Sequence, residues 1–123
     1  MKKMIFVILL LLLSGICQAA DPSAATKVEI AHLFSFLENS GCQLNRNGSW
    51  YGAKEAVAHL NKKYQYLLGK DMISTTESFI KGAASESSMS GKPYLVKCPG
   101  SAPVKSAAWF MAELAQYRKV RGK

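Results

Sequence analysis

The sequence has few of the residues on which most catalytic and metal chemistry depends. Its 123 residues include three cysteines, two histidines and eight acidic residues, against sixteen lysines and arginines. The two histidines lack the His-x3-His spacing of a helical metal site, so we expect no metal and no other cofactor. No Walker-type Gly-Lys-Ser sequence and no Gly-x-Ser-x-Gly sequence occurs. These absences argue against a nucleotide-binding enzyme and against the common serine hydrolases.

No stretch reaches the roughly 20 apolar residues that a membrane-spanning helix needs. The longest apolar run covers residues 4–16; it follows two lysines and precedes Cys17 and Ala19. This order is typical of a secretory signal peptide. We therefore predict that residues 1–19 are removed by cleavage after Ala19, with Ala20 as the alternative position. The mature protein is then expected in the periplasm or secreted.

Basic residues outnumber acidic ones, but their distribution is uneven. Four of them fall within residues 118–123, which we predict to be a basic C-terminal tail. The remaining mature chain, residues 20–117, has nearly balanced charges and is long enough for a single globular domain. Nucleic-acid binding needs a basic face with stacking aromatic residues, so we expect no nucleic-acid partner. A monomer that binds an envelope protein or a small anionic molecule fits this charge pattern better.

Four segments have the apolar spacing of amphipathic helices. We expect the first to begin at an N-cap at Asp21 and the second to begin near Ala53 and end at Gly69. The third is expected to begin at a capping box that starts at Ser74, and the last to open at Pro103. Four helices would supply most of the hydrophobic core.

The five residues that begin at Cys42 and the five that end at Cys98 alternate as strands do. Pairing them antiparallel, with the cysteines opposite each other, sets Leu44 against Val96 and puts the apolar side chains on one face. Directly opposed cysteines are within disulfide reach, and export favours oxidation over two buried thiols. The predicted fold is therefore α+β, with about four helices and a two-stranded antiparallel ribbon, unless the strands are irregular extended segments.

Two of these regions carry a resemblance to a known family. The sequence Asn-Arg-Asn-Gly at residues 45–48 and the sequence Ser-Gly-Lys-Pro-Tyr at residues 90–94 together resemble the YfeK-like family of small exported bacterial proteins. The resemblance covers roughly residues 42–98. It implies a periplasmic location and no particular activity.

The strand pairing also predicts a binding surface. If Arg46 lies opposite Tyr94, the Asn-Gly turn and the serine-rich segment meet at one end of the ribbon. Hydroxyls and backbone amides there could surround a phosphate or carboxylate, with lysine and arginine supplying positive charge. The simpler alternatives are a polar linker and stacking of Arg46 on Tyr94. The predicted binding residues are Arg46, Asn47, Ser88, Ser90, Gly91, Lys92 and Tyr94.

Two other functions remain open. Glu55 and His59 stand four residues apart on the second expected helix, so Glu55 could orient the imidazole as a general base for Ser88 or a neighbouring serine. The protein would then be a small envelope hydrolase, although an ordinary acid–imidazole pair explains the spacing equally simply. An exposed Trp109 could instead anchor an inhibitor of a secreted enzyme. Because no catalytic motif is present, we expect a binding or interaction protein rather than an enzyme.

Overall fold

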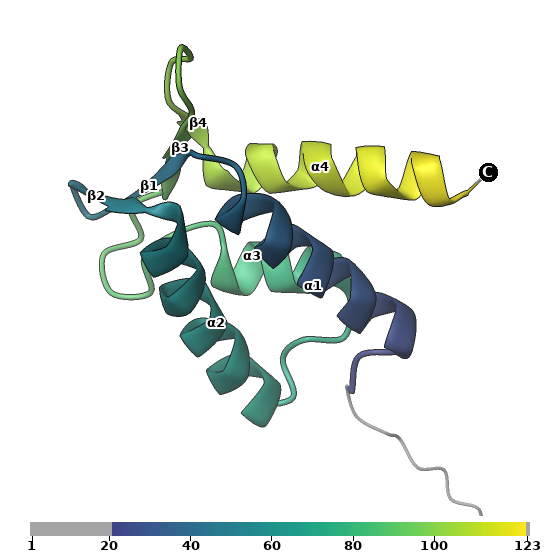
Figure 1. Ribbon diagram of the computed structural model, residues 1–123. Helices are drawn as coiled ribbons and strands as arrows, with labels where there is room; N and C mark the ends of the chain where they lie inside the picture. Colours follow the sequence, from purple (N-terminus) through teal and green to yellow (C-terminus); the bar gives the residue numbers. More distant parts are fainter. Residues whose placement is uncertain (1–20, 123) are drawn as a thin grey trace, which may run out of the picture.

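The computed structural model describes residues 21–122, and the predicted signal peptide lies outside the described residues. The fold is α+β, as predicted (Figure 1). Within the described residues, no helix is both long and apolar enough to cross a bilayer. The elements, in chain order, are α1 (Ala24–Glu38), β1 (Gln43–Arg46), β2 (Ser49–Gly52), α2 (Ala53–Gly69), α3 (Thr76–Ala83), β3 (Leu95–Lys97), β4 (Val104–Lys105) and α4 (Ser106–Arg121).

The strands form one antiparallel sheet in the order β2-β1-β3-β4. The predicted pairing of β1 with β3 is confirmed, with Leu44 opposite Val96. The ribbon is extended on both sides, because β2 pairs with β1 and β4 pairs with β3. Asn47 and Gly48 join β1 to β2, with φ values of 52° and 91°. Two consecutive positive φ angles give the two-residue turn whose twist matches that of a hairpin.

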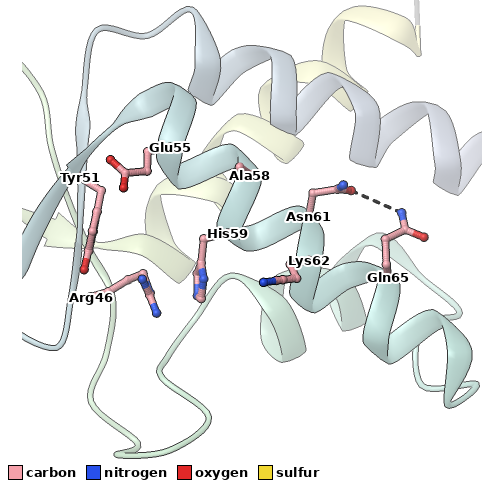
Figure 2. Close-up of a pocket in the computed structure, with 8 residues that line it drawn as sticks. All are labelled: Arg46, Tyr51, Glu55, Ala58, His59, Asn61, Lys62 and Gln65. Carbon is pink, nitrogen blue, oxygen red and sulfur yellow. Dashed lines mark hydrogen bonds between the residues drawn. The ribbon is translucent and has the colours of Figure 1, made fainter.

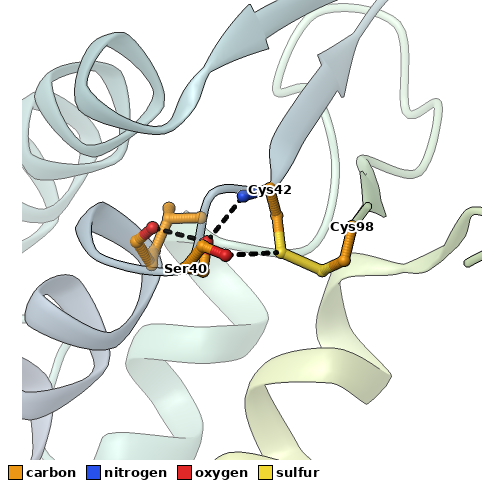
Figure 3. The surroundings of a disulfide bond; sticks show 4 residues. Ser40, Cys42 and Cys98 are labelled. Carbon is orange, nitrogen blue, oxygen red and sulfur yellow. Dashed lines mark hydrogen bonds between the residues drawn. A yellow bond between two sulfur atoms is a disulfide. The ribbon is translucent and has the colours of Figure 1, made fainter. Parts of the chain in front are cut away.

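The disulfide between Cys42 and Cys98 is also confirmed (Figure 3). It joins the residue before β1 to the residue after β3, and the two Cα atoms are 4.1 Å apart. Ser40 fixes the approach to β1, since its hydroxyl donates to the carbonyl of Leu37 and accepts from the amide of Cys42 at 3.0 Å. The bond therefore ties the β1–β2 hairpin to the segment that follows the serine-rich loop.

The helices cover one face of the sheet, and the core lies between them (Figure 1). Leu44 and Val96 point from the sheet into this core and are almost fully buried. Alternation along β1 and β3 leaves Gln43 and Lys97 exposed on the opposite face. The helical core residues follow the expected spacing: Ile30, Leu33, Leu37, Ala56, Leu60, Tyr64, Phe79, Ile80, Ala83, Phe110 and Leu114.

Two helix starts differ from the sequence prediction by one or two residues. The N-cap of α1 is Ser23 rather than Asp21, because the Ser23 hydroxyl accepts a hydrogen bond from the amide of Thr26 at 3.1 Å. The capping box of α3 consists of Thr75 and Ser78, one residue later than expected. Each hydroxyl there accepts from the other residue's backbone amide, which satisfies two amides of the first turn.

The last helix and the predicted tail need a larger correction. The segment after Pro103 first forms β4, and α4 begins at Ser106, whose hydroxyl donates to a carbonyl at the end of α3. The helix continues to Arg121, so residues 118–121 belong to the folded domain. Arg118 forms ion pairs with Glu29 and Glu77. Arg118, which we assigned to the basic C-terminal tail, therefore holds α1, α3 and α4 together.

Candidate functional site

Cationic side chains gather where the β1–β2 hairpin meets α2. Strand alternation puts Arg46 on the same face of β1 as the buried Leu44, so its side chain reaches over α2. Figure 2 shows Arg46 beside His59, with Lys62 one turn further along the helix. The Arg46 guanidinium lies 5.2 Å from the ring centroid of Tyr51. The predicted stacking on Tyr94 is therefore wrong: Tyr51, on the paired strand, provides the aromatic face.

These cations have no acidic partner among residues 21–122. The ion pairs found there within 4.0 Å involve other residues, and none includes Arg46, Lys62 or Lys63. The Nε–H group of Arg46 is buried and donates to no hydrogen-bond partner in the described part of the chain. Buried polar atoms are nearly always paired in proteins. An unpaired guanidinium nitrogen beside two further cations is a feature of this region that the fold itself does not use.

A chain of hydrogen bonds links α2 to the start of β3. Lys63 donates from Nζ to the hydroxyl of Tyr94 at 3.1 Å and to the carbonyl of Glu86 at 2.8 Å. The same Tyr94 hydroxyl lies 3.2 Å from Nε2 of His59. Because the ammonium group can only donate, the phenol accepts from Lys63 and keeps its own proton available for Nε2 of His59. When the phenol donates that proton, the imidazole is neutral and carries its proton on Nδ1.

The surroundings of His59 favour that neutral form. Burial lowers the pKa of His59, and the positive charges of Arg46, Lys63 and Lys62 lower it further, to about 4. Both effects disfavour the imidazolium, the first through loss of hydration and the second through repulsion. At neutral pH the site therefore contains fixed positive charges and an uncharged hydrogen-bonding imidazole. Its electrostatic character suits an anion.

Two hollows open on either side of Arg46 and His59. One is a shallow cleft of about 610 Å³ along the first half of α2, bordered by Tyr51, Glu55 and Lys62 (Figure 2). The other has a volume of about 220 Å³ and brings together four of the predicted binding residues with residues of α2 and of the serine loop. Its walls are formed by Arg46, Asn47, His59, Lys63, Ser87, Ser88, Met89 and Tyr94.

The predicted meeting of the hairpin turn and the serine-rich loop is present. Asn47 accepts a hydrogen bond from the Ser90 hydroxyl at 2.6 Å and donates one to the Ser87 hydroxyl at 3.2 Å. These contacts span 43 and 40 residues of sequence. Ser90, Gly91 and Lys92 form the outer part of the loop and do not line the 220 Å³ hollow. Only the inner part of the loop contributes to the hollow.

The loop amides do not form the cradle that we expected for an anion. The amides of Met89 and Ser90 point at the Ser87 hydroxyl, and that of Gly91 donates to the Ser87 carbonyl at 2.9 Å. The amide of Lys92 donates to the Ser90 hydroxyl. These four loop amides are thus satisfied within the loop. Any anion-binding capacity rests on the side chains of the hairpin and α2.

The arrangement required for a hydrolase is not assembled. Glu55 and His59 form no hydrogen bond or ion pair in the described residues, and Figure 2 shows the carboxylate turned toward Tyr51. The Nε2 atom of His59 is already occupied by Tyr94. Ser88 lines the same hollow as His59, but no hydrogen bond joins them. Geometry therefore supplies neither an oriented base nor an activated nucleophile.

Trp109 offers little support for an inhibitor surface. It is partly buried, and its ring packs 4.9 Å from Phe36 and 5.1 Å from Phe110 between ring centroids. Its contacts explain its presence through core packing. Within residues 21–122, no cluster of three or more histidine, cysteine or acidic side chains has the geometry to hold a metal ion.

Comparisons with known proteins agree with the family resemblance. A family of unknown function, DUF5329, matches residues 24–118. The chain belongs to this family. It is 36% identical over 97 residues to the uncharacterized protein YfeK of Salmonella typhimurium, covering 76% of this chain and 77% of that one. No solved structure matches. The family match thus covers nearly all of the folded domain, from the start of α1 to Arg118 near the end of α4, and it assigns no activity.

In this member of the DUF5329 family, Lys63 is the main residue of the site that was not among the predicted binding residues. Four residues separate it from His59, so both lie on one flank of α2. That spacing was available from the sequence. The sequence also predicted Tyr94 opposite Arg46. It did not show that α2 packs close enough for Lys63 to reach the Tyr94 hydroxyl.

Proposed function

We propose that this protein is a non-catalytic binding module that holds a small anion, a carboxylate or a phosphate, in the 220 Å³ hollow. The site lies between the end of β1, the middle of α2 and the inner part of the serine loop. Arg46 and Lys63 supply the positive charge, and Ser88 offers a hydroxyl. The observation that carries the proposal is the group of cations without an acidic partner in the described residues, which includes a buried guanidinium nitrogen.

Each side chain has a distinct part in this proposal. The planar guanidinium of Arg46 presents parallel N–H groups to two oxygens, and Tyr51 holds its plane. Lys63 is fixed by its bonds to Tyr94 and Glu86, so little side-chain entropy is lost on binding. A bound anion would stabilise the protonated form of His59. Its pKa would rise from about 4 when the hollow is filled.

The test is a titration of the mature protein with inorganic phosphate and with acetate at low ionic strength. Calorimetry measures the affinity, and NMR of the His59 ring measures its pKa. We expect saturable binding, a raised His59 pKa, and at least tenfold weaker affinity in Arg46→Met and Lys63→Met. Lys97→Met is the matched control, because Lys97 is exposed on the opposite face of the sheet. Binding that is absent, or equal in all four proteins, would refute the anion site.

We further propose that the module works as a monomer in the periplasm after removal of residues 1–19. The disulfide supports this location, because such bonds persist in oxidising compartments. Fractionation of native cells tests the location, and mass spectrometry of the mature N-terminus tests the removal of residues 1–19. A protein recovered from the cytoplasm with its leader intact would contradict the location.

A further inference from the structure

The 220 Å³ hollow continues into a second one with different chemistry. Lys63 and Ser88 line both hollows. The second has a volume of about 200 Å³, and its remaining walls are Lys62, Tyr66 and Leu67. The two hollows therefore adjoin at Lys63 and Ser88 along the flank of α2 that runs from His59 toward the C-terminus of the helix, and we treat them together as one groove.

The walls of this groove change from charged to apolar along a single flank of the helix. His59, Lys63 and Leu67 are spaced four residues apart, and Tyr66 follows Lys62 at the same interval. Such spacing places them in line on one side of α2. The second hollow is bordered by the Tyr66 ring, which is 64% exposed, and by the Leu67 side chain. Exposed aromatic and aliphatic surface beside unpaired cations calls for a ligand that has both characters.

Ser88 also borders a further hollow of about 340 Å³, whose walls combine Met72 and Gly82 with the polar side chains of Ser78, Lys81 and Glu86. Gly82 has no side chain, and a methyl group there would approach the Cδ1 atom of Leu67 to 3.0 Å. The absence of a side chain at residue 82 thus keeps the Leu67 wall in place. Glu86 borders this distant hollow and not the first two.

We propose that the ligand is a small amphiphilic carboxylate, with its anionic head between Arg46 and Lys63 and a short alkyl group along Tyr66 and Leu67. This inference rests on the proposed anion site and specifies its ligand class. Charge complementarity selects an anionic head, because three cations and no acidic side chain border the first two hollows. The size of the second hollow selects a short apolar group. Fully polar ligands would leave its walls unused.

A series of straight-chain carboxylates tests this proposal directly. Acetate, butyrate, hexanoate and octanoate are titrated by calorimetry at constant ionic strength and below their micellar concentrations. Burial of each methylene is expected to strengthen binding by about twofold to fourfold. We expect the gain to level off once the second hollow is filled. Octanamide, which has the same chain and no charge, is expected to bind at least tenfold more weakly than octanoate.

Variants separate the head from the alkyl group. Tyr66→Ala is expected to weaken octanoate binding about fivefold and to leave acetate binding unchanged, because Tyr66 touches only the second hollow. Met111→Ala is the control, since Met111 is an exposed apolar residue on α4, away from both hollows. Arg46→Met is expected to weaken every member of the series.

The outcomes distinguish the two proposals. Affinity that does not change from acetate to octanoate, while still falling in Arg46→Met, would overturn the amphiphile and keep the anion site. Octanoate binding that is unaffected by Tyr66→Ala would overturn the alkyl site in the same way. Octanamide binding as tight as that of octanoate would overturn the anionic head, and no binding by any probe would overturn both proposals.

Discussion

Two arginines of this protein have opposite surroundings. Arg118, near the end of α4, donates to Glu29 at 2.8 Å and to Glu77 at 2.6 Å, so that one guanidinium joins three helices. Glu29 also accepts a hydrogen bond from Thr76. Arg46, at the end of β1, lies over an aromatic ring and has no carboxylate partner in the described residues. Among the described residues, Arg118 thus pairs with two carboxylates and Arg46 pairs with none.

The difference shows which charges the fold needs. Hydrogen bonds from Arg118 lower the pKa values of Glu29 and Glu77, which means that the folded state favours their ionised forms. That cluster stabilises the helices, and four of the five N–H groups of Arg118 are used in it. Around Arg46, burial and the unbalanced positive charge of Arg46, Lys63 and Lys62 together lower the pKa of His59 instead. We therefore assign stability to Arg118 and the proposed binding to Arg46.

Removal of the disulfide should have the largest effect, and it should affect both regions. The bond closes a 56-residue separation, which corresponds to about 4 kcal/mol in the chain-entropy account. We expect the free energy of unfolding of Cys42→Ala/Cys98→Ala, measured by denaturant titration, to be lower than that of the parent by most of this amount. Anion binding should weaken as well, because the bond places β1 beside the strand that follows the serine loop. A double variant as stable as the parent would contradict this role.

Exchange of each arginine for methionine should separate the two regions. Arg118→Met leaves the partly buried Glu29 carboxylate without its cation, and we expect a loss of about 2 kcal/mol in unfolding free energy. Anion affinity should not change. Arg46→Met should do the reverse, with the free energy of unfolding within about 0.5 kcal/mol of the parent and anion binding lost.

Urea titrations and phosphate calorimetry on the same two variants check this pair of predictions. The distinction between a structural and a functional arginine is wrong if both variants lose stability equally. It is also wrong if Arg118→Met weakens phosphate binding as much as Arg46→Met does.

Alternation and cysteine chemistry were sufficient to predict the centre of the fold. The β1–β3 register follows from one requirement, that Leu44 and Val96 face the same side, and it brings the cysteines together. The second helix was predicted with the bounds it has, because its apolar spacing runs without interruption from Ala53 to Gly69. Strong local periodicity and a covalent constraint carry over to the structure.

Most of the features that were not predicted depend on contacts between distant segments, and the β2 strand is the exception. The β2 strand has a recognisable signal, an Asn-Gly turn followed by Trp50 and Tyr51, which is typical of a hairpin. The β4 strand has only two residues and exists because β3 lies beside it. The partners of Arg118 and of Lys63 belong to other elements. Residues 118–121 therefore read as a charged tail in the sequence, although Arg118 pairs inside the domain.

Mild acid should affect the region around Arg46 before the region around Arg118. The folded pKa of His59, about 4, lies below its unfolded value of 6.5, so the unfolded chain takes up a proton first as the pH falls. Stability is then lost as the pH drops from about 6.5 toward 4. We expect a contribution of about 1.5 kcal/mol between pH 7.5 and 5, after allowance for solvent screening.

The two glutamates titrate in a lower range. Their folded pKa values lie below the unfolded value of 4.5, so their stabilisation is complete above that pH and is lost only as the pH falls further. Denaturant titrations at pH 7.5, 5 and 3.5 check both ranges. His59→Gln should reduce the loss between pH 7.5 and 5, and Arg118→Met should reduce the loss below pH 4.5. The assignment of the two pH ranges is wrong if His59→Gln changes the stability loss below pH 4.5, or if Arg118→Met changes the loss between pH 7.5 and 5.

The smallest expected effect concerns Asn47, which connects the hairpin turn to the serine loop. Asn47→Gly keeps the positive φ of 52° without strain, and it removes the side-chain hydrogen bonds to Ser87 and Ser90. Both bonds join exposed or partly buried groups, so the free energy of unfolding should fall by only about 0.5 to 1 kcal/mol. Ser88 and Met89 should become more mobile, and anion affinity should fall about threefold. Backbone NMR relaxation measures the loop mobility, and calorimetry measures the anion affinity. Unchanged loop mobility would show that strand pairing alone keeps the serine loop beside Arg46.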